Sequence, residues 1–352
     1  MKYFKMIAAC ALAFCMQAAM AAPLSVRTVM SGLYNPRGLA LSPWGALYVA
    51  EAGSGGAGPC VTMRGLPRCY GPSGAVTRLW FGRQERVLEG LPSYSDPAFA
   101  EVTGPHDIGF DWFGNAFVVI GWGDDPALRS QFGPPGAEFG TLLRIQPFYK
   151  WHSWQLVADL AAHEAAENPT GGELNSNPYG LLVLSPGQSY IADAGANDLL
   201  EARWDGSVKT VAIFRARGMG DSTDAVPTAV VRGPDRAFYV SELTGAPFAD
   251  GAARIYRVQP GSAPTIFASG FKTIIDFDFA RDGTLYVLQH ATGPVFFGGP
   301  GEIIRVAKDG SRSVVAGGLD RPTSLVVAPG GVIYVTNHGV STGGGEVLRI
   351  VP

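Results

Sequence analysis

The hydrophobic positions of this chain follow one pattern that occurs six times. Each copy has a short apolar run, a tight turn, and an aromatic residue followed by Val or Ile; the aromatic residues are Tyr48, Phe117, Tyr190, Tyr239, Tyr286 and Tyr334. A proline stands twelve residues before the aromatic residue in five copies, and Ile274 takes its place in the fifth copy. A repeated sheet that cannot bury its own faces is typical of a β-propeller.

Further apolar runs predict four strands in each repeat, because they are short, rich in β-branched residues and bounded by turns. Third strands are expected over 75–79, 141–145, 198–202, 253–258, 302–306 and 346–350, and fourth strands over 85–88, 155–158, 208–211, 264–267 and 312–315. The sixth copy has no fourth strand of its own, and residues 26–33 are similar to residues 312–319. We therefore expect an all-β, six-bladed β-propeller with four-stranded antiparallel blades, closed by the N-terminal strand pairing with the last blade.

The first residues have the pattern of a cleavable export signal. Lys2 and Lys5 precede an apolar run over 6–16, and Ala19 and Ala21 supply the small residues of a cleavage site. We expect residues 1–21 to be removed and residues 22–352 to form one propeller domain. The mature protein would then be periplasmic or secreted.

The mature chain keeps two cysteines, Cys60 and Cys69, which flank a short loop. In an oxidising compartment an isolated pair this close predicts a disulfide. A metal site from two thiolates and a redox pair are the alternatives, although a redox pair is more often Cys-x-x-Cys.

Composition limits the partners. The formal net charge of −3 argues against a nucleic acid or an anionic membrane as partner. No segment outside the export signal has the pattern of a membrane span. We expect a monomer whose 47 glycines and 26 prolines serve frequent turns.

The first two repeats carry the most specific motifs of the chain. These are Asn35-Pro-Arg-Gly-Leu, Tyr48-Val-Ala-Glu-Ala-Gly, the loop from Cys60 to Cys69, and Ser73-Gly-Ala-Val-Thr-Arg. In this order they resemble the ScyD/ScyE family of exported bacterial propellers. The resemblance extends to Pro352 and implies a six-bladed TolB-like or NHL-like propeller, but no settled reaction.

Long connections are concentrated on one face of the predicted propeller, which we call the upper face. They comprise residues 51–73, 91–105, 120–140, 160–177, 215–226, 242–252, 290–301 and 337–345. Residues 160–167 have the composition of a short helix. Long loops on a rigid scaffold usually carry function, so we expect this face to bind a small molecule, a glycan or a protein.

Two positions of the repeat place polar residues near the upper mouth of the central channel. Three residues after each aromatic residue stand Glu51, Ile120, Asp193, Glu242, Gln289 and Asn337, and His290 and His338 follow the last two. One residue after each repeat start stand Arg37, His106, Tyr179, Thr228, Ile275 and Thr323. Equivalent blades would bring both sets around the channel, where Tyr179, Gln289, His290, Asn337 and His338 are candidate ligand-binding residues.

Several interpretations of these residues are open. The polar residue that ends each aromatic strand could bond the backbone amides of a neighbouring turn. Alternatively, Glu51, Asp193 and Glu242 could hold a hard cation such as Ca²⁺, while a histidine ligand would favour zinc or manganese. Such a cation would polarise an ester carbonyl in a lactonase or esterase. A third interpretation is quinone-dependent sugar oxidation, with His106 and Arg37 as the catalytic pair.

Overall fold

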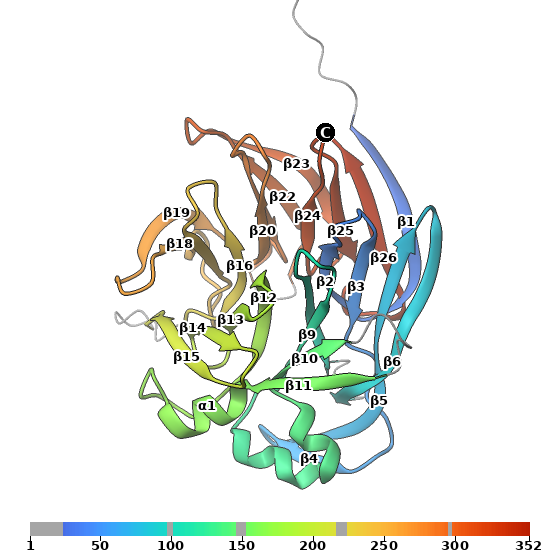
Figure 1. Ribbon diagram of the computed structural model, residues 1–352. Helices are drawn as coiled ribbons and strands as arrows, with labels where there is room; N and C mark the ends of the chain where they lie inside the picture. The colour runs from blue at the N-terminus through green and yellow to red at the C-terminus, as the bar shows by residue number, and fades with distance from the viewer. Residues whose placement is uncertain (1–23, 97–100, 146–152, 216–223, 295–297) are drawn as a thin grey trace, which may run out of the picture.

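A computed structural model describes residues 24–96, 101–145, 153–215, 224–294 and 298–352 of the chain, so the predicted export signal lies outside the described residues. The strands form six antiparallel sheets. The innermost strand of each sheet contacts the innermost strand of the next, and the sixth contacts the first. The chain is therefore a closed six-bladed β-propeller, as the repeat predicts (Figure 1).

The repeat positions set where the two inner strands of each blade lie. Five of the six innermost strands begin at the repeat-start residue, and the sixth begins three residues after Pro322. The innermost strands are β2 (Pro36–Leu41), β8 (Pro105–Phe110), β12 (Pro178–Ser185), β16 (Pro227–Arg232), β20 (Ile274–Phe279) and β24 (Leu325–Val327). The second strands, which contain the aromatic residues, are β3 (Leu47–Glu51), β9 (Ala116–Ile120), β13 (Gln188–Asp193), β17 (Phe238–Glu242), β21 (Leu285–Gln289) and β25 (Ile333–Asn337).

The two outer strands lie where the apolar runs predict them. The third strands are β5 (Leu66–Trp80), β10 (Thr141–Ile145), β14 (Asp198–Arg203), β18 (Ala253–Val258), β22 (Gly301–Val306) and β26 (Thr342–Val351). The fourth strands are β6 (Arg83–Asp96), β11 (Trp154–Asp159), β15 (Val208–Ile213), β19 (Thr265–Phe271) and β23 (Arg312–Leu319), and β1 (Ser25–Tyr34) takes this place in the last blade. Apolar side chains on both faces of the blades fill the spaces between neighbouring sheets.

The N-terminal strand closes the ring. β1 pairs antiparallel with β26, from Ser25 opposite Val351 to Tyr34 opposite Thr342. In Figure 1 the first strand, in blue, lies beside the last, in red. Met30 and Leu33 of β1 are buried and pack with the apolar side chains of β2 and β3. The predicted closure is confirmed.

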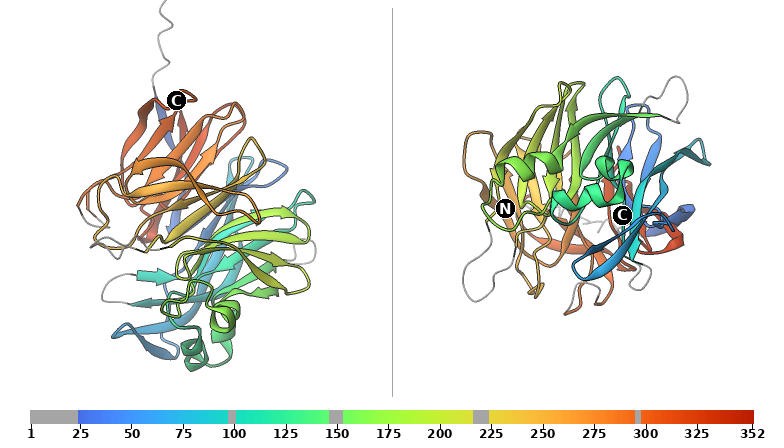
Figure 2. Two further views of the ribbon diagram at one scale, coloured as in Figure 1. Left: turned by 90° about the vertical axis from the view of Figure 1, so that its left-hand side faces the viewer. Right: turned by 90° about the horizontal axis from the view of Figure 1, so that it is seen from below.

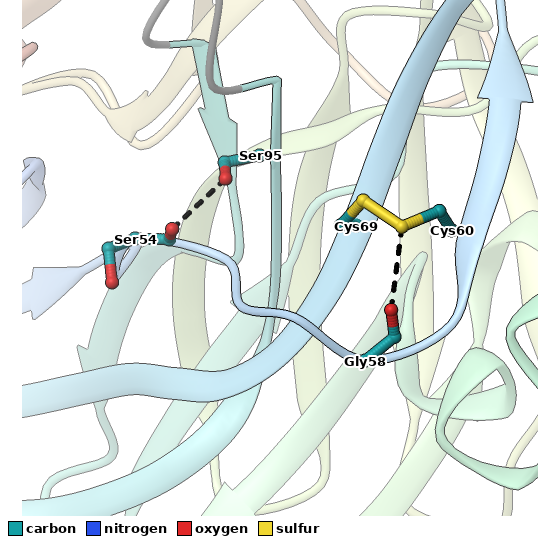
Figure 3. The surroundings of a disulfide bond; sticks show 5 residues. All are labelled: Ser54, Gly58, Cys60, Cys69 and Ser95. Atoms are coloured by element: carbon teal, nitrogen blue, oxygen red, sulfur yellow. Dashed lines mark hydrogen bonds between the residues drawn. A yellow bond between two sulfur atoms is a disulfide. The ribbon is translucent and has the colours of Figure 1, made fainter.

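The first blade has more strands than the repeat predicts. β4 (Cys60–Met63) forms a hairpin with β5, and β7 (Glu101–Thr103) pairs with β6, which gives this blade six strands. Cys60 and Cys69 lie directly opposite each other in the hairpin and form the predicted disulfide (Figure 3). Beside it, the Ser95 hydroxyl donates to the carbonyl oxygen of Ser54 at 3.0 Å and joins the preceding loop to β6.

Short helices cover part of the upper face. α1 (Leu160–Glu167) lies where a helix is predicted, and the Asp159 side chain caps it by accepting from the backbone N–H of Ala162 at 2.9 Å. It contacts the 3₁₀ helix η1 (Pro126–Phe132), which is followed by η2 (Pro134–Glu138). At the bottom of Figure 1, η1 lies beside the β4 hairpin and α1 lies to the left of it; the helices face the viewer in the right panel of Figure 2. Within the described segments, no helix has the length and apolar character needed to cross a membrane.

Candidate functional site

A β-bulge at the start of the innermost strands turns one side chain toward the central channel. In β8, Pro105 pairs with Ile120 and Asp107 pairs with Val119, so His106 is an extra residue in the ladder. Such a bulge changes the direction in which its side chain points. The same single-residue shift occurs at Tyr179, Thr228 and Ile275, and a longer one includes Arg37.

The bulged residues surround a cavity of about 390 Å³ at the upper mouth of the channel. All six positions that follow the repeat start line it: Arg37, His106, Tyr179, Thr228, Ile275 and Thr323. The predicted convergence of this position is thus confirmed. Side chains from the upper loops complete the lining, including Glu101, Asn177, His290 and Arg321. The volume is within the usual range for a small-molecule site.

Arg37 is the dominant charge of the cavity wall. Its side chain is buried, and its guanidinium donates to the carbonyl oxygens of Gly339 and, at 3.0 Å, Val102. Among the described residues no carboxylate forms an ion pair with it. Burial lowers the pKa of the guanidinium, which reflects the cost of holding this charge away from water.

Two histidines on opposite blades are held in the same way. The Nδ1 atom of His106 lies 3.0 Å from the carbonyl oxygen of Pro178, and that of His290 lies 2.8 Å from the carbonyl oxygen of Pro322. Each proline begins the next blade. Because a carbonyl oxygen only accepts, Nδ1 must carry the hydrogen in both rings, and Nε2 carries the lone pair.

Burial keeps both imidazoles neutral. It lowers the pKa of His106 to about 3, with a further contribution from the positive charge of Arg37. Burial also lowers the pKa of His290 to about 4. Tyr179, whose ring centroid lies 4.9 Å from that of His106, has its pKa raised by burial to about 12 and stays a hydrogen-bond donor. At neutral pH the buried guanidinium of Arg37 therefore lies among neutral donors and acceptors, while Glu101 and Arg321 belong to the loops that complete the lining.

The residues that end the aromatic strands do not line this cavity. Four of them accept a hydrogen bond from a backbone N–H just before the innermost strand of their own blade. The pairs are Glu51 with Tyr34 at 2.7 Å, Asp193 with Asn177 at 2.6 Å, Gln289 with Lys272 at 2.7 Å and Asn337 with Asp320 at 2.7 Å. In these four blades the observed contacts are those expected from the turn-bonding interpretation.

The three predicted carboxylate ligands are each engaged within their own blade. Glu51 forms an ion pair with Arg86 at 2.7 Å, and Glu242 accepts from the Tyr256 hydroxyl at 3.0 Å. Asp193 accepts from three backbone amides and from the Ser176 hydroxyl. In the described part of the chain, no group of three or more His, Cys, Asp or Glu side chains could hold a metal ion. The structure therefore does not bring these carboxylates together as the sequence suggests.

The predicted ligand-binding residues divide into two sets. Tyr179 and His290 line the cavity, together with the predicted pair His106 and Arg37. Gln289, Asn337 and His338 do not; the last is half-exposed, with Nδ1 2.8 Å from a carboxylate oxygen of Asp320. Sequence reasoning missed Glu101, Asn177 and Arg321. Asn177 and Arg321 stand directly before repeat-start prolines, a position whose residue type differs between repeats, and Glu101 lies in a long connection of the first blade.

Two aspartates below the cavity were also missed. Asp107 and Asp276 stand two residues after their repeat starts and line the floor of the channel. Each accepts a backbone N–H from the next blade: Leu181 at 2.7 Å for Asp107 and Leu325 at 2.9 Å for Asp276. The sequence feature that could have identified them is the occurrence of an aspartate at the same position of two repeats.

No family model matches the sequence, and neither does any curated protein. Solved structures do share its fold. A PQQ-bound aldose sugar dehydrogenase from Streptomyces coelicolor is 15% identical, with 94% of this chain and 98% of that chain covered and a TM-score of 0.55. A gluconolactonase from Xanthomonas campestris is 12% identical (93% and 89% covered, TM-score 0.53), and a calcium-binding regucalcin from Agrobacterium tumefaciens is 12% identical (93% and 93%, TM-score 0.52).

These similarities establish the class of fold. The chain has the fold of a six-bladed β-propeller, which it shares with these three proteins. At these identities the likeness says nothing of the reaction. No family match supports the resemblance to ScyD/ScyE, which stays a prediction.

Proposed function

We propose that the protein binds a small carboxylate-bearing molecule in the cavity at the upper mouth of the channel. The observation that carries the proposal is the buried guanidinium of Arg37, whose hydrogen bonds in the described structure go only to backbone carbonyls. A buried charge without a counter-ion is costly. A carboxylate would neutralise it and accept from the guanidinium hydrogens that the carbonyls leave available.

The other cavity residues favour a hydroxylated ligand. The Nε2 atom of His106 can accept, and the Tyr179 hydroxyl can donate or accept. The hydroxyl groups of Thr228 and Thr323 already donate to the carbonyl oxygens of Ile274 and Pro36, so they can accept from a ligand. Opposite walls could therefore bond several hydroxyl groups of one molecule. A sugar acid matches this arrangement better than a purely apolar acid, and the size of the cavity favours a small molecule over a glycan chain or a protein.

The test is binding of sugar acids to the mature chain. We expect gluconate or glucuronate to bind, measured by calorimetry, and glucose to bind far more weakly. Arg37→Met should weaken binding about tenfold to a hundredfold, since a charge-assisted hydrogen bond contributes about 1.5–3 kcal/mol. Arg281→Met, at an exposed turn on the opposite face, is the matched control and should bind normally. Equal affinity for acid and neutral sugar, or an unaffected Arg37→Met variant, would contradict the proposal.

A second candidate is hydrolysis of a lactone or ester that carries a carboxylate. The Nε2 lone pair of His106 could accept a proton from water, and Arg37 could stabilise the developing oxyanion. The low pKa of His106 makes it a weak base in the free protein. A bound carboxylate would offset the charge of Arg37, one of the causes of that low pKa, and so strengthen the base.

Hydrolase activity has its own test. Sugar lactones would be supplied to the wild type and to His106→Asn, with and without a chelator. Loss of turnover in the variant with sugar-acid binding retained would favour the hydrolase; loss with the chelator would favour its cation-dependent form. Unchanged turnover in the variant would show that His106 takes no part in the reaction.

The third candidate, quinone-dependent sugar oxidation, is supported by the common location of His106 and Arg37. Both line one cavity, as hydride abstraction by this pair would require. PQQ is a polycarboxylate, so Arg37 is also the residue that would bind it. Reduction of a dye by the protein supplied with PQQ and an aldose would support this candidate. If PQQ binds but no dye is reduced, the protein is not a quinone-dependent sugar dehydrogenase.

A further inference from the structure

Acidic side chains with unsatisfied oxygens are buried beneath α1, away from the central cavity. α1 follows the outer strand of the second blade and reaches the third blade, where His163 Nε2 lies 2.9 Å from the hydroxyl of Thr210 in β15. That hydroxyl lies 3.3 Å from Asp198 Oδ2 and can donate to it. Glu164, the residue after His163, is 2% exposed, and Asp198 at the start of β14 is fully buried.

Four acceptor atoms at this place have no hydrogen-bond donor in good geometry within the described structure. They are both carboxylate oxygens of Glu164, Oδ1 of Asp198 and Oδ1 of Asn175. Four unsatisfied acceptors in three neighbouring residues are unusual, because the large majority of buried polar groups in folded proteins are bonded.

The contacts from His163 through Thr210 join α1 to Asp198, and the electrostatics of the two carboxyl groups agree with this arrangement. Burial raises the pKa of Asp198 well above its usual value, and the negative charges of Asp193 and Glu164 add to this. Burial likewise raises the pKa of Glu164 to about 7, and the negative charge of Asp193 adds to this, while a contact from the backbone N–H of Asn175 acts in the opposite direction. Asp193 is already satisfied by Ser176 and by backbone amides. The unsatisfied oxygens therefore belong to two carboxylates and one amide.

We propose that Glu164, Asp198 and Asn175 bind a divalent cation, with Ca²⁺ as the best match. Two carboxylates balance the charge of such an ion, and an all-oxygen set suits a hard cation. His163 is engaged with Thr210 and adds no nitrogen ligand. The site joins α1 to the third blade, so the ion would fix part of the upper face.

This site differs from the one suggested by the repeat, because Glu51 and Glu242 take no part in it. It is also independent of ligand binding at Arg37. The two proposals can therefore fail separately. Sugar-acid binding is tested with Arg37→Met, and cation binding is tested with variants of Glu164 and Asp198.

The first experiment uses the mature chain after metal removal with a chelator. We expect the melting temperature to rise by about 2–4 °C when Ca²⁺ reaches about ten times its dissociation constant. Elemental analysis after Ca²⁺ loading and desalting should find one ion per chain. If Ca²⁺, Mg²⁺ and Mn²⁺ all leave the melting temperature unchanged and no ion is found, the carboxyls are protonated and the proposal is wrong.

Glu164→Gln is the decisive variant. It removes a buried charge, so the metal-free variant should melt at or above the temperature of the metal-free wild type, while its response to Ca²⁺ should be lost. Glu167→Gln changes an exposed residue one turn along the same helix and should respond normally, as should Glu242→Gln. Asp198→Asn provides a second variant if Glu164→Gln fails to fold. A full Ca²⁺ response in either site variant would overturn the assignment of ligands.

Discussion

At the scale of single residues, the role of each side chain depends on which atom its neighbours leave available. His106 and His290 come from different positions of the repeat, yet both give their Nδ1 hydrogen to the carbonyl that begins the next blade. This bond orients the ring and leaves Nε2 as the acceptor. Neutral imidazoles beside a buried guanidinium make the cavity a site for an anion with hydroxyl groups.

The protonation of these histidines can be measured. We expect ¹⁵N NMR to find His106 and His290 in the Nδ1–H form with no titration between pH 8 and about pH 5, because burial lowers their pKa values to about 3 and about 4. Replacement of His106 and His290 by Asn, one at a time, would assign the signals. A titration near pH 6.5 for either ring would mean that water reaches it freely.

Gly121 offers an independent check on the position of His106. A Cβ atom at residue 121 would lie 2.0 Å from Cε1 of His106, so Gly121→Ala must displace the ring. The displaced imidazole should lose its bond to Pro178, and its ¹⁵N shifts should then resemble those of an exposed histidine.

At the scale of elements, buried aspartates join neighbouring blades. Asp107, Asp276 and Asp278 each accept a backbone N–H from the innermost strand of the next blade, the last from Val327 at 2.8 Å. Burial raises the pKa of Asp276 to about 7 and that of Asp278 to about 6. The blades are therefore joined by carboxyl groups that hold a proton more tightly in the folded protein than in the unfolded chain.

Asp278 should give the protein a measurable pH dependence. Between about pH 4 and pH 6 the folded state keeps a proton on Asp278 that the unfolded state releases, so this residue makes the free energy of unfolding decrease as pH rises. Asp278→Asn cannot titrate. The stability of the wild type relative to the variant, from urea unfolding, should therefore fall across this window and be level above it. A difference that rises with pH would show that Asp278 is ionised in the fold.

The sequence predicted the positions of the strands well, but it predicted less well the directions in which the side chains point. A proline twelve positions before an aromatic residue located four innermost strands at their first residue, and the same spacing before Tyr286 located the fifth at Ile274. These two positions mark the start of one strand and a residue inside the next. The bulge after each proline has no sequence signature of its own. One extra residue turns Arg37 and His106 into the cavity, while Glu51 and Asp193 serve backbone amides instead. The β4 hairpin and the ligands beneath α1 lie outside the repeat and could not be inferred from it.

At the scale of the whole molecule, the cavity exists only because the ring is closed. Its lining residues come from all six blades, and Arg37 of the first blade donates to the carbonyl oxygen of Gly339 in the last. Thr323 of the last blade donates to the carbonyl oxygen of Pro36 at 2.8 Å. Closure by β1 and the geometry around Arg37 are therefore coupled, since both depend on the contact between the first and last blades.

This coupling predicts the effect of removing β1. Deletion of residues 22–33 takes away the strand that pairs with β26 and exposes that edge, so we expect a large loss of stability and self-association. Leu33→Ala tests the same contact more gently: this fully buried side chain should contribute about 2–5 kcal/mol. Val26→Ala, at a half-exposed position of the same strand, should change stability by less than about 0.5 kcal/mol.

Urea unfolding and light scattering would measure these effects, and calorimetry would report whether sugar-acid binding weakens with them. If the deleted protein unfolds at the same urea concentration as the full mature chain, β1 is not what holds the first and last blades together. If it is destabilised yet binds as tightly, the cavity is formed by the inner strands alone. Loss of both properties is the result expected of a ring whose binding site and closure share one contact.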